Sequence, residues 1–242
     1  MNEISGQHGQ EKTRITVVIP VYNEGNNVMP VCLAISDVWN DLRQYDRQVI
    51  FVDDGSKDDT WSKIVSASKS DHSVKGIRFT RNFGKDAAIE AGLKESSGEA
   101  VIVMDGDLQH PPELILEFVK AWKAGNDIIR ARNENPPHRS FLKRLSSSLF
   151  YRLLNISSET AIAPGSSDFC LMSRRVVNKL NSLTEKGRFY RVLAQWTGFR
   201  SISIPYKAKE RVNGKSVYTF SKLFSLARAA IVSSSTMPMT VI

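Results

Sequence analysis

The sequence predicts an α/β fold, with a doubly wound, mostly parallel central sheet and amphipathic helices toward the C-terminal end. Two observations predict it. Over residues 14–131, short runs rich in β-branched residues alternate with segments of helical periodicity. These runs lack the polar alternation of a one-sided sheet, which is typical of strands covered on both faces. A chain of 242 residues with 41% hydrophobic residues can also bury a sizeable core, which excludes disordered, collagen-like and disulfide-scaffold classes.

The first half of the chain is predicted to contain five buried parallel strands and the helices between them. One helix is expected to begin at Asp59 and another at the Pro111-Pro112 pair, because acidic caps and proline are favoured at helix starts. Glycines at 98 and 125 are expected to lie just beyond helix ends. The predicted strands are Ile15–Ile19, Val49–Val52, Gly76–Phe79, Ala100–Met104 and Asp127–Ala131, and the predicted helices are 28–42, 59–70, 85–96 and 111–124.

Beyond Ala131 the regular alternation ends. Residues 141–155 have apolar side chains at helical spacing, with basic residues alongside, and this pattern is compatible with a core helix, a docking face or a membrane-surface helix. Residues 167–180 are predicted as a short strand that enters a helix. The remaining predicted elements are a helix around Phe189–Thr197, a strand at Ser201–Ile204 and an amphipathic helix over Tyr218–Val232.

Charge is distributed unevenly along the chain. Residues 1–129 hold 14 basic and 20 acidic side chains, whereas residues 130–242 hold 19 basic and 5 acidic ones, for a total of +8. The basic part indicates an anionic partner, and nucleic acid, an anionic membrane surface and phosphorylated ligands are the candidate classes. Cys32 and Cys170 lie far apart in apolar surroundings, which favours core packing in a reducing compartment.

Acidic residues follow two of the predicted strands directly. In doubly wound sheets, ligands bind at the carboxyl ends of the strands. Asp105-Gly106-Asp107 would place two hard oxygen ligands there, which suits Mg²⁺ or Mn²⁺ bridging a diphosphate, although a solvated loop is the alternative. Asp53-Asp54-Gly55-Ser56 could accept hydrogen bonds from a nucleoside, or form an ordinary turn with a helix cap.

Five motifs, in this order and spacing, carry a resemblance. VVIPVYNE, VDDGSKDDT, RNFGKDAAIEAGL, VIVMDGDLQHPPE and SDFCLMSRRVV resemble the family-2 inverting glycosyltransferases of the A-type, nucleotide-diphospho-sugar transferase fold. Within these the sequence is most similar to the polyprenyl-phosphate sugar transferases, such as dolichyl-phosphate mannose synthase and bactoprenol glucosyltransferase. The likeness runs from about Ile15 to Pro238. It implies a metal-dependent, inverting single displacement that transfers a hexose from a nucleotide sugar to a polyprenyl phosphate.

The resemblance also implies roles for individual residues. Asp105, Asp107 and Gln109 match the family's metal and diphosphate site for Mg²⁺ or Mn²⁺, and Asp107 and Asp168 are the expected catalytic residues. Lys85, which is predicted to open a helix near the donor, and Asp54 are further expected substrate contacts. The substrate-binding residues implied by the family motifs are Pro20, Tyr22, Glu24 and Asp53 for the nucleotide, and Arg130, Arg132, Arg211, Lys215 and Ser216 for phosphates.

Two positions depart from the family pattern. Val217 stands where the family often has Lys, and Asn133 stands where an acid or Arg is common, which affects the expected acceptor contacts. His110 is expected to be a structural part of its proline-containing turn. The expected domain boundaries are a disordered lead-in at 1–13 and a glycosyltransferase catalytic domain at 14–210, divided into a nucleotide-binding half (14–131) and an acceptor half (132–210). An acceptor loop and an amphipathic juxtamembrane helix are expected at 211–242.

The nature of the acceptor determines what Asp168 must do. A lipid monophosphate with a second pKa near ~6 is mostly dianionic at neutral pH and needs little help from a general base. Asp168 would then orient a group, and its replacement by Asn would cost little. A hydroxyl acceptor would need a base, and the same replacement would cost several orders of magnitude in rate.

Three functions remain open from the sequence. The first is hexose transfer to a polyprenyl phosphate at the cytoplasmic face of the membrane, the second is transfer to a soluble or polysaccharide hydroxyl, and the third is a non-catalytic membrane- or nucleic-acid-binding module. The intact DGDLQH motif favours an enzyme.

The expected partners are a nucleotide sugar (UDP- before GDP-, with UDP-glucose first), polyprenyl phosphate and an anionic membrane surface, without nucleic acid; a homo-oligomer is left open. The 14 uncharged residues after Arg228 resemble the approach to a membrane segment, so a peripheral protein with helices following Ile242 is one expectation.

Overall fold

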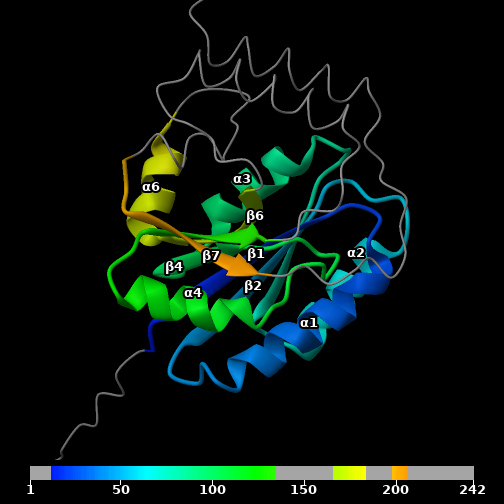
Figure 1. Cartoon of the computed structure of the whole chain (residues 1–242). Coiled ribbons are helices and arrows are strands. Elements are labelled where there is room, and N and C mark those ends of the chain that lie inside the picture. The colour runs from blue at the N-terminus through cyan, green and yellow to red at the C-terminus, as the bar shows by residue number, and fades with distance from the viewer. Residues whose placement is uncertain (1–11, 135–165, 184–197, 207–242) are drawn as a thin grey trace, which may run out of the picture.

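The computed structural model describes residues 12–134, 166–183 and 198–206, and these form a seven-stranded sheet with helices on both faces (Figure 1). The order of the strands across the sheet is β3-β2-β1-β4-β6-β5-β7. Because β1 lies between β2 and β4, the chain reverses its winding direction at β1, as expected of a doubly wound sheet. The strands are β1 (Arg14–Val21), β2 (Asp46–Asp53), β3 (Val74–Arg78), β4 (Ala100–Val103), β5 (Ile128–Asn133), β6 (Ser166–Ser173) and β7 (Ser201–Tyr206).

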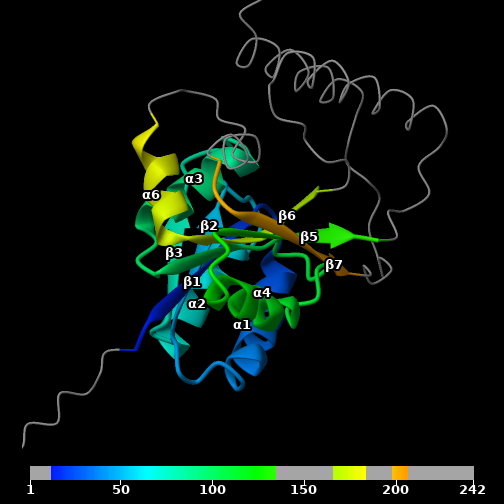
Figure 2. The same ribbon diagram turned by 60° about the vertical axis from the view of Figure 1, so that its left-hand side comes forward.

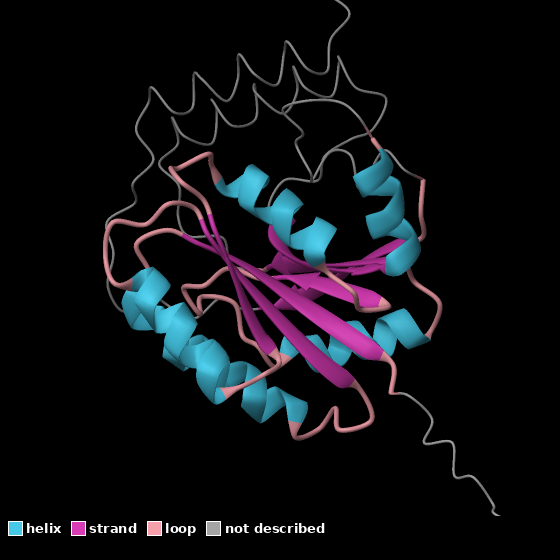
Figure 3. Ribbon diagram, turned by 180° about the vertical axis from the view of Figure 1, so that it is seen from behind, coloured by secondary structure: helices cyan, strands magenta, loops and turns pink. Residues whose placement is uncertain are grey.

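The helices cover the sheet in two layers. One face packs against α3 and α6 and the other against α1, α2 and α4, which gives three layers in all (Figures 1 and 3). In β1, β2 and β4 both faces are therefore removed from water, which explains why these strands are continuous hydrophobic runs. The helices are α1 (Gly25–Trp39), α2 (Thr60–Ser70), α3 (Lys85–Glu95), α4 (Leu114–Lys123) and α6 (Arg174–Ser182).

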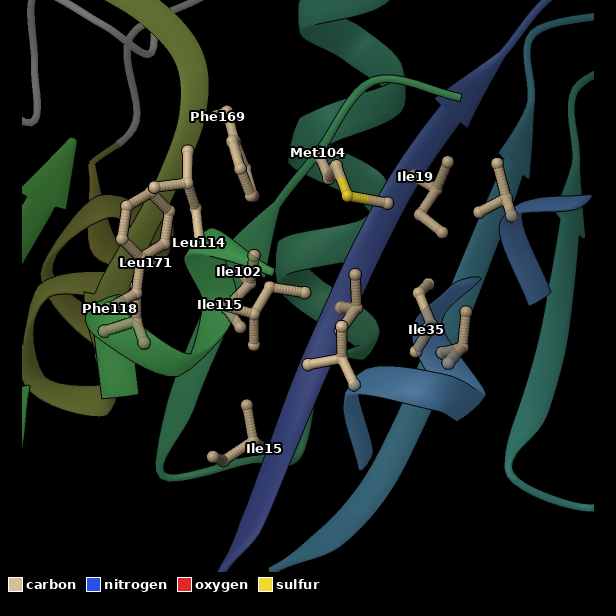
Figure 4. Packing of buried hydrophobic residues seen from close by; sticks show 14 of the residues in the cluster. Ile15, Ile19, Ile35, Ile102, Met104, Leu114, Ile115, Phe118, Phe169 and Leu171 are labelled. Carbon is tan, nitrogen blue, oxygen red and sulfur yellow. The ribbon is translucent and has the colours of Figure 1, made fainter. Parts of the chain in front are cut away.

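Two hydrophobic clusters hold these layers together. The larger one joins β1, β4 and β6 to α1 and α4, and Figure 4 shows Ile19, Ile102 and Phe169 among its members. The smaller one lies on the opposite face, where Val18 and Val103 pack with Ile89 of α3. Successive residues of a strand point to opposite faces, so neighbouring residues such as Val18 and Ile19 belong to different clusters.

The strand β6 runs against the others. It pairs antiparallel with both β4 and β5, whereas β1, β2, β3, β4, β5 and β7 run in one direction (Figure 2). The first residues of β6 therefore lie at the edge of the sheet where the parallel strands end. The same pairing places β6 and β7 in one sheet with the strands of the expected nucleotide-binding half.

The five strands predicted in the first half are confirmed as parallel, with their ends shifted by up to three residues. The prediction that all five are buried was wrong for β3, which lies at the edge of the sheet and is mostly exposed. Two of the predicted helices had wrong boundaries. The helix predicted over 28–42 spans Gly25–Trp39, and the chain continues to Leu42 in turns in which Leu42 N–H donates to the Trp39 carbonyl. Leu42 stays buried, which is why the apolar pattern extends past the end of the helix.

The helix predicted from Pro111 begins instead at Leu114. The carbonyls of Pro111 and Pro112 accept hydrogen bonds from Leu114 and Ile115, so the proline pair forms a turn before the helix. The helices expected at 141–155, 189–197 and 218–232 lie outside the described residues. Among the residues that the structure describes, no helix is long and apolar enough to cross a membrane.

Candidate active site

The residues predicted to carry the chemistry come together at the carboxyl edge of the sheet. Glu24 follows β1, Asp53 ends β2 and Asp105 follows β4. In the antiparallel pairing of β4 with β6, Val103 lies opposite Cys170. The same register, continued by two residues in each direction, brings Asp105 opposite Asp168, on the face of the sheet that α3 covers.

Lys85, the first residue of α3, bridges these two carboxylates. Its ammonium lies 2.7 Å from Oδ2 of Asp168 and is also in direct contact with Oδ1 of Asp105. Asp168 is almost completely buried, with 5% of its side chain exposed, whereas 25% of the Asp105 side chain is exposed. Burial alone would lower the pKa of Lys85, but the charges of Asp105 and Asp168 and their hydrogen bonds raise it above its ordinary value.

The segment after β4 turns sharply between Asp105 and His110. Leu108 adopts φ +55°, and Oδ1 of Asp107 accepts a hydrogen bond of 3.1 Å from the Gln109 backbone N–H. At Gly106 an added Cβ would lie 2.8 Å from Cγ1 of Val21, so this turn packs closely against β1. The conformation of this turn thus fixes the backbone that carries Asp107 and Gln109, just after Asp105.

The oxygen donors of this turn fit a divalent cation of the kind the sequence predicts. Among the described residues, no three His, Cys, Asp or Glu side chains are grouped so that they could hold a metal unaided. Mg²⁺ usually takes one or two carboxylates from the protein and completes its shell with substrate phosphates and water. Two aspartates and the amide of Gln109 suit that mode of binding.

Glu24 adds a further acid to this edge. Its carboxylate accepts a hydrogen bond from the side chain of Asn27. Burial raises the pKa of Glu24, and the charges of Asp107, Asp58 and Asp105 raise it further against the lowering effect of Asn27. The part of this edge that the structure describes is therefore an acidic cluster bridged by Lys85, and its excess of negative charge favours the binding of additional cations.

His110 packs at the inner side of this cluster. Its ring lies 5.3 Å from that of Phe169 and 5.6 Å from that of Tyr206, and Nδ1 is 3.9 Å from Oδ2 of Asp105. Burial lowers the pKa of His110 below its ordinary value despite the nearby acids. The aromatic contacts agree with a structural role. The approach of Nδ1 to the carboxylate of Asp105 is a feature that the sequence did not indicate.

Asp53 is fully buried and organises the loop after β2. Its Oδ1 accepts a hydrogen bond of 2.8 Å from the Ser56 backbone N–H, and Oδ2 lies 3.5 Å from Nε of Arg78. Gly55 within this loop has φ +72°, a conformation that favours glycine. A contact between Asp53 and a nucleotide base stays a prediction.

Asp54 connects this loop to the start of α3. Its two carboxylate oxygens accept hydrogen bonds from the backbone N–H groups of Phe83, at 2.7 Å, and Gly84, at 2.9 Å. Lys85 follows Gly84 directly, so Asp54 helps to place the lysine that bridges Asp105 and Asp168. The structure thus shows a positioning role for Asp54, and direct contact with a substrate stays a prediction.

The remaining predicted substrate contacts are distributed as follows. Pro20 is buried in β1, while Tyr22 just beyond it has 42% of its surface exposed. Arg130 of β5 is buried, and its Nε has no hydrogen-bond partner among the residues the structure describes, whereas Arg132 is exposed. Three predicted contacts, Arg211, Lys215 and Ser216, lie outside the described residues.

Two basic residues of the second half do not face this edge. Arg174 donates to the Gly98 carbonyl and Arg175 forms a two-pronged ion pair with Asp127, both at the amino edge of the sheet. The excess of basic residues beyond position 129, which indicated an anionic partner, therefore includes two residues that pair within the protein itself. They brace the start of α6 instead.

The bridging position of Lys85 could have been suspected from the sequence. A cation at the first position of a helix opposes the helix dipole, which favours negative charge there. Such a residue calls for anionic partners, and Asp105 and Asp168 supply them. Their identity depends on strand pairing and could not be derived locally.

The sequence of the chain is similar to those of known glycosyltransferases. The family model described as glycosyl transferase family 2 matches residues 16–180. A putative glycosyltransferase, CsbB, of Bacillus subtilis (strain 168) is 42% identical over 219 residues, which is 90% of this chain and 66% of that protein. The bactoprenol glucosyl transferase of Shigella phage SfV is 39% identical over 228 residues, which is 94% of this chain and 74% of that protein. The chain thus spans about two thirds to three quarters of the length of these relatives.

Solved structures share the fold. The mannosyltransferase PcManGT from Pyrobaculum calidifontis, in complex with GDP-Man and Mn²⁺, superposes with a TM-score of 0.61 at 19% identity, covering 93% of this chain and 63% of that one. Glucosyl-3-phosphoglycerate synthase from Mycobacterium tuberculosis, in complex with Mn²⁺, UDP and phosphoglyceric acid, gives 0.60 at 17% identity, covering 91% of this chain and 77% of that one. At these identities the likeness concerns the fold alone.

Proposed function

The chain belongs to glycosyl transferase family 2, and from this premise we propose that it transfers a hexose from a nucleotide sugar to a polyprenyl phosphate. The observation that carries the proposal is the acidic cluster around Asp105, Asp168 and Lys85 at the carboxyl edge of the sheet, next to the reversal of winding at β1. Ligands of doubly wound sheets bind at that place.

The donor is bound with its diphosphate toward the turn after β4. Asp105, Asp107 and Gln109 are the residues that would hold Mg²⁺ or Mn²⁺, and the cation, when bound, neutralises charge on the departing nucleoside diphosphate. Asp53 and Glu24 approach the nucleoside from the ends of β2 and β1, with Tyr22 exposed beside them. UDP-glucose is the first donor to test, because several relatives are named bactoprenol glucosyl transferase.

The acceptor phosphate attacks the anomeric carbon in a single displacement that inverts its configuration. Asp168 lies across from Asp105, where an acid near the reacting carbon is expected. Arg130 and Arg132, at the end of the neighbouring strand β5, supply positive charge toward that end of the sheet. The buried Arg130 side chain, whose Nε lacks a hydrogen-bond partner among the described residues, is suited to an anionic oxygen.

We assign the reaction to the cytoplasmic face of the membrane, with the protein attached peripherally. This assignment rests on the name of the bactoprenol relatives, because a polyprenyl phosphate is a membrane lipid. Transfer to a hydroxyl acceptor is the alternative that the test below distinguishes.

The test is a screen of radiolabelled nucleotide sugars with vesicles that contain undecaprenyl phosphate, in the presence of Mg²⁺ or Mn²⁺. Label is expected in the lipid phase with one donor, first UDP-glucose and then other UDP- and GDP-sugars. Asp105→Asn should abolish the incorporation, whereas Lys94→Gln, a charge removal on the far end of α3, should leave it unchanged. Label that appears only in a soluble product would exclude the lipid acceptor.

A further inference from the structure

The ammonium of Lys85 contacts the carboxylate of Asp105, which is predicted to bind the metal. Both carboxylates lie within ion-pair distance of one ammonium, so Asp105 and Asp168 are close enough to repel each other strongly without it. In the free protein, Lys85 supplies positive charge to both carboxylates at the edge of the core.

The two carboxylates hold the ammonium in different surroundings. Asp168 is almost fully buried in β6, where an unpaired charge is costly, and therefore needs a permanent counter-charge. Asp105 is five times as exposed, and it is also the member of the pair that belongs to the DGD turn. Asp105 is thus the partner that can exchange its cation.

Lys85 can change partners without moving the fold. Its ammonium is carried on a flexible four-carbon stem, and 42% of its side chain is exposed. The backbone before it is held by the two hydrogen bonds to Asp54. The stem can therefore rotate while the start of α3 stays in place.

We propose that Lys85 is an internal cation that holds the place of the divalent metal at Asp105 in the free protein, and that its ammonium leaves Asp105, while remaining beside Asp168, when the metal and a nucleoside diphosphate bind. This rests on the proposed function for the identity of the diphosphate, but not for the exchange at Asp105. Released from Asp105, the ammonium becomes available to the diphosphate oxygens.

The exchange predicts opposite effects on two ligands. Without Lys85, the pair of carboxylates carries more net negative charge, so Mn²⁺ alone should bind more tightly. When Lys85 is present, a nucleoside diphosphate gains a contact with its positive charge. Lys85→Gln is therefore expected to lower the dissociation constant for Mn²⁺ by about tenfold or more, since a unit charge a few ångströms away acts strongly in a partly buried site. The same variant is expected to weaken UDP or GDP binding in the presence of saturating Mn²⁺.

Mn²⁺ binding without nucleotide can be measured by the electron paramagnetic resonance signal of the free ion. Lys94→Gln is the matched control, because it removes the same charge from the same helix at a surface pair with Glu90, and it should leave the affinity unchanged. Lys85→Arg keeps the charge and should bind Mn²⁺ as the wild type does. Unchanged or weaker Mn²⁺ binding by a folded Lys85→Gln variant would overturn the proposal.

A measurement on the wild-type protein covers the case in which Lys85→Gln does not fold. In crystals grown with Mn²⁺ and UDP or GDP, the distance from Nζ of Lys85 to the nearest Asp105 carboxylate oxygen should exceed 4 Å, and a retained contact would overturn the proposal. Neither measurement requires sugar transfer. Failure of the transfer screen would therefore refute the proposed function alone, and failure here would refute the exchange alone.

Discussion

Lys85 and Asp168, which are far apart in the sequence, form an ion pair of 2.7 Å between the start of α3 and the start of β6. The pair exists because β6 runs antiparallel to β4 and returns its first residues to the edge where α3 begins. An acid that is predicted to act near the reacting carbon is thereby held in one orientation before any substrate binds. Four predictions concern this pair and residues at increasing distance from it.

Replacing Asp168 by Asn tests whether the acceptor needs a base. With a polyprenyl phosphate acceptor, the loss of rate should be modest at pH 8, because the acceptor is then mostly a dianion. It should grow as the pH falls below about 6, where the acceptor carries a proton that must leave. Rates of wild type and variant at several pH values, with circular dichroism to verify folding, measure this. A loss of several orders of magnitude at pH 8 would instead identify Asp168 as an indispensable base.

Replacing Asp54 by Asn should destabilise the loop that precedes Lys85. An amide side chain presents one acceptor oxygen where two backbone N–H groups now find one oxygen each, so one partly buried donor loses its partner. The expected loss in the free energy of unfolding is about 1–3 kcal/mol, measured by urea denaturation. Asp41→Asn, at an exposed position, is the control and should change stability little. Equal effects of the two substitutions would contradict the positioning role.

Gly55 should tolerate alanine less well than Gly125 does. Both adopt positive φ, +72° and +90°, so each alanine variant suffers backbone strain of roughly 1–2 kcal/mol. At Gly55 the added Cβ would also lie 2.5 Å from the backbone carbon of Arg81, whereas at Gly125 it would meet nothing within 4 Å. Overpacking of this kind adds about 1–3 kcal/mol, so Gly55→Ala should be clearly less stable in urea than Gly125→Ala. Similar stabilities of the two variants would mean that the loop after β2 shifts to accommodate the added Cβ at little cost.

The pair of Asp127 and Arg175 should make stability depend on pH in the acid range. Hydrogen bonds from Arg175 and Ser173 lower the pKa of Asp127 below its ordinary value of 3.8, despite burial. A lowered pKa in the folded state means that the stabilisation is fully present above the ordinary value and is lost as the pH falls through the folded-state value.

The free energies of unfolding of wild type and Asp127→Asn, compared from pH 7 to pH 2.5, test this dependence. The difference between them is expected to be constant down to about pH 5 and to shrink below the ordinary pKa of the carboxyl group. A difference that widens toward acid pH would show that the carboxylate is not the stabilising form.

Much of the fold was predictable from local sequence. The runs ITVVI and AVIVM became parallel strands because a strand covered on both faces must be apolar throughout. The acids after β2 and β4 were recognised because the carboxyl ends of such strands meet at one edge. Helix ends were less predictable, since Leu42 is buried by a turn as well as it would be by a helix.

The sequence by itself therefore determined which residues form strands and which carboxylates end them, and its five motifs already indicated the family. Only the tertiary structure decided that β6 enters the sheet in reverse between β4 and β5, that Lys85 joins Asp105 to Asp168, and that Arg174 and Arg175 brace the opposite edge. The physical reason is that hydrophobic periodicity shows which faces of a segment are buried, but does not show which distant segment packs against them. Strand order and ion-pair partners depend on long-range pairing, in which side chains far apart in the chain become neighbours.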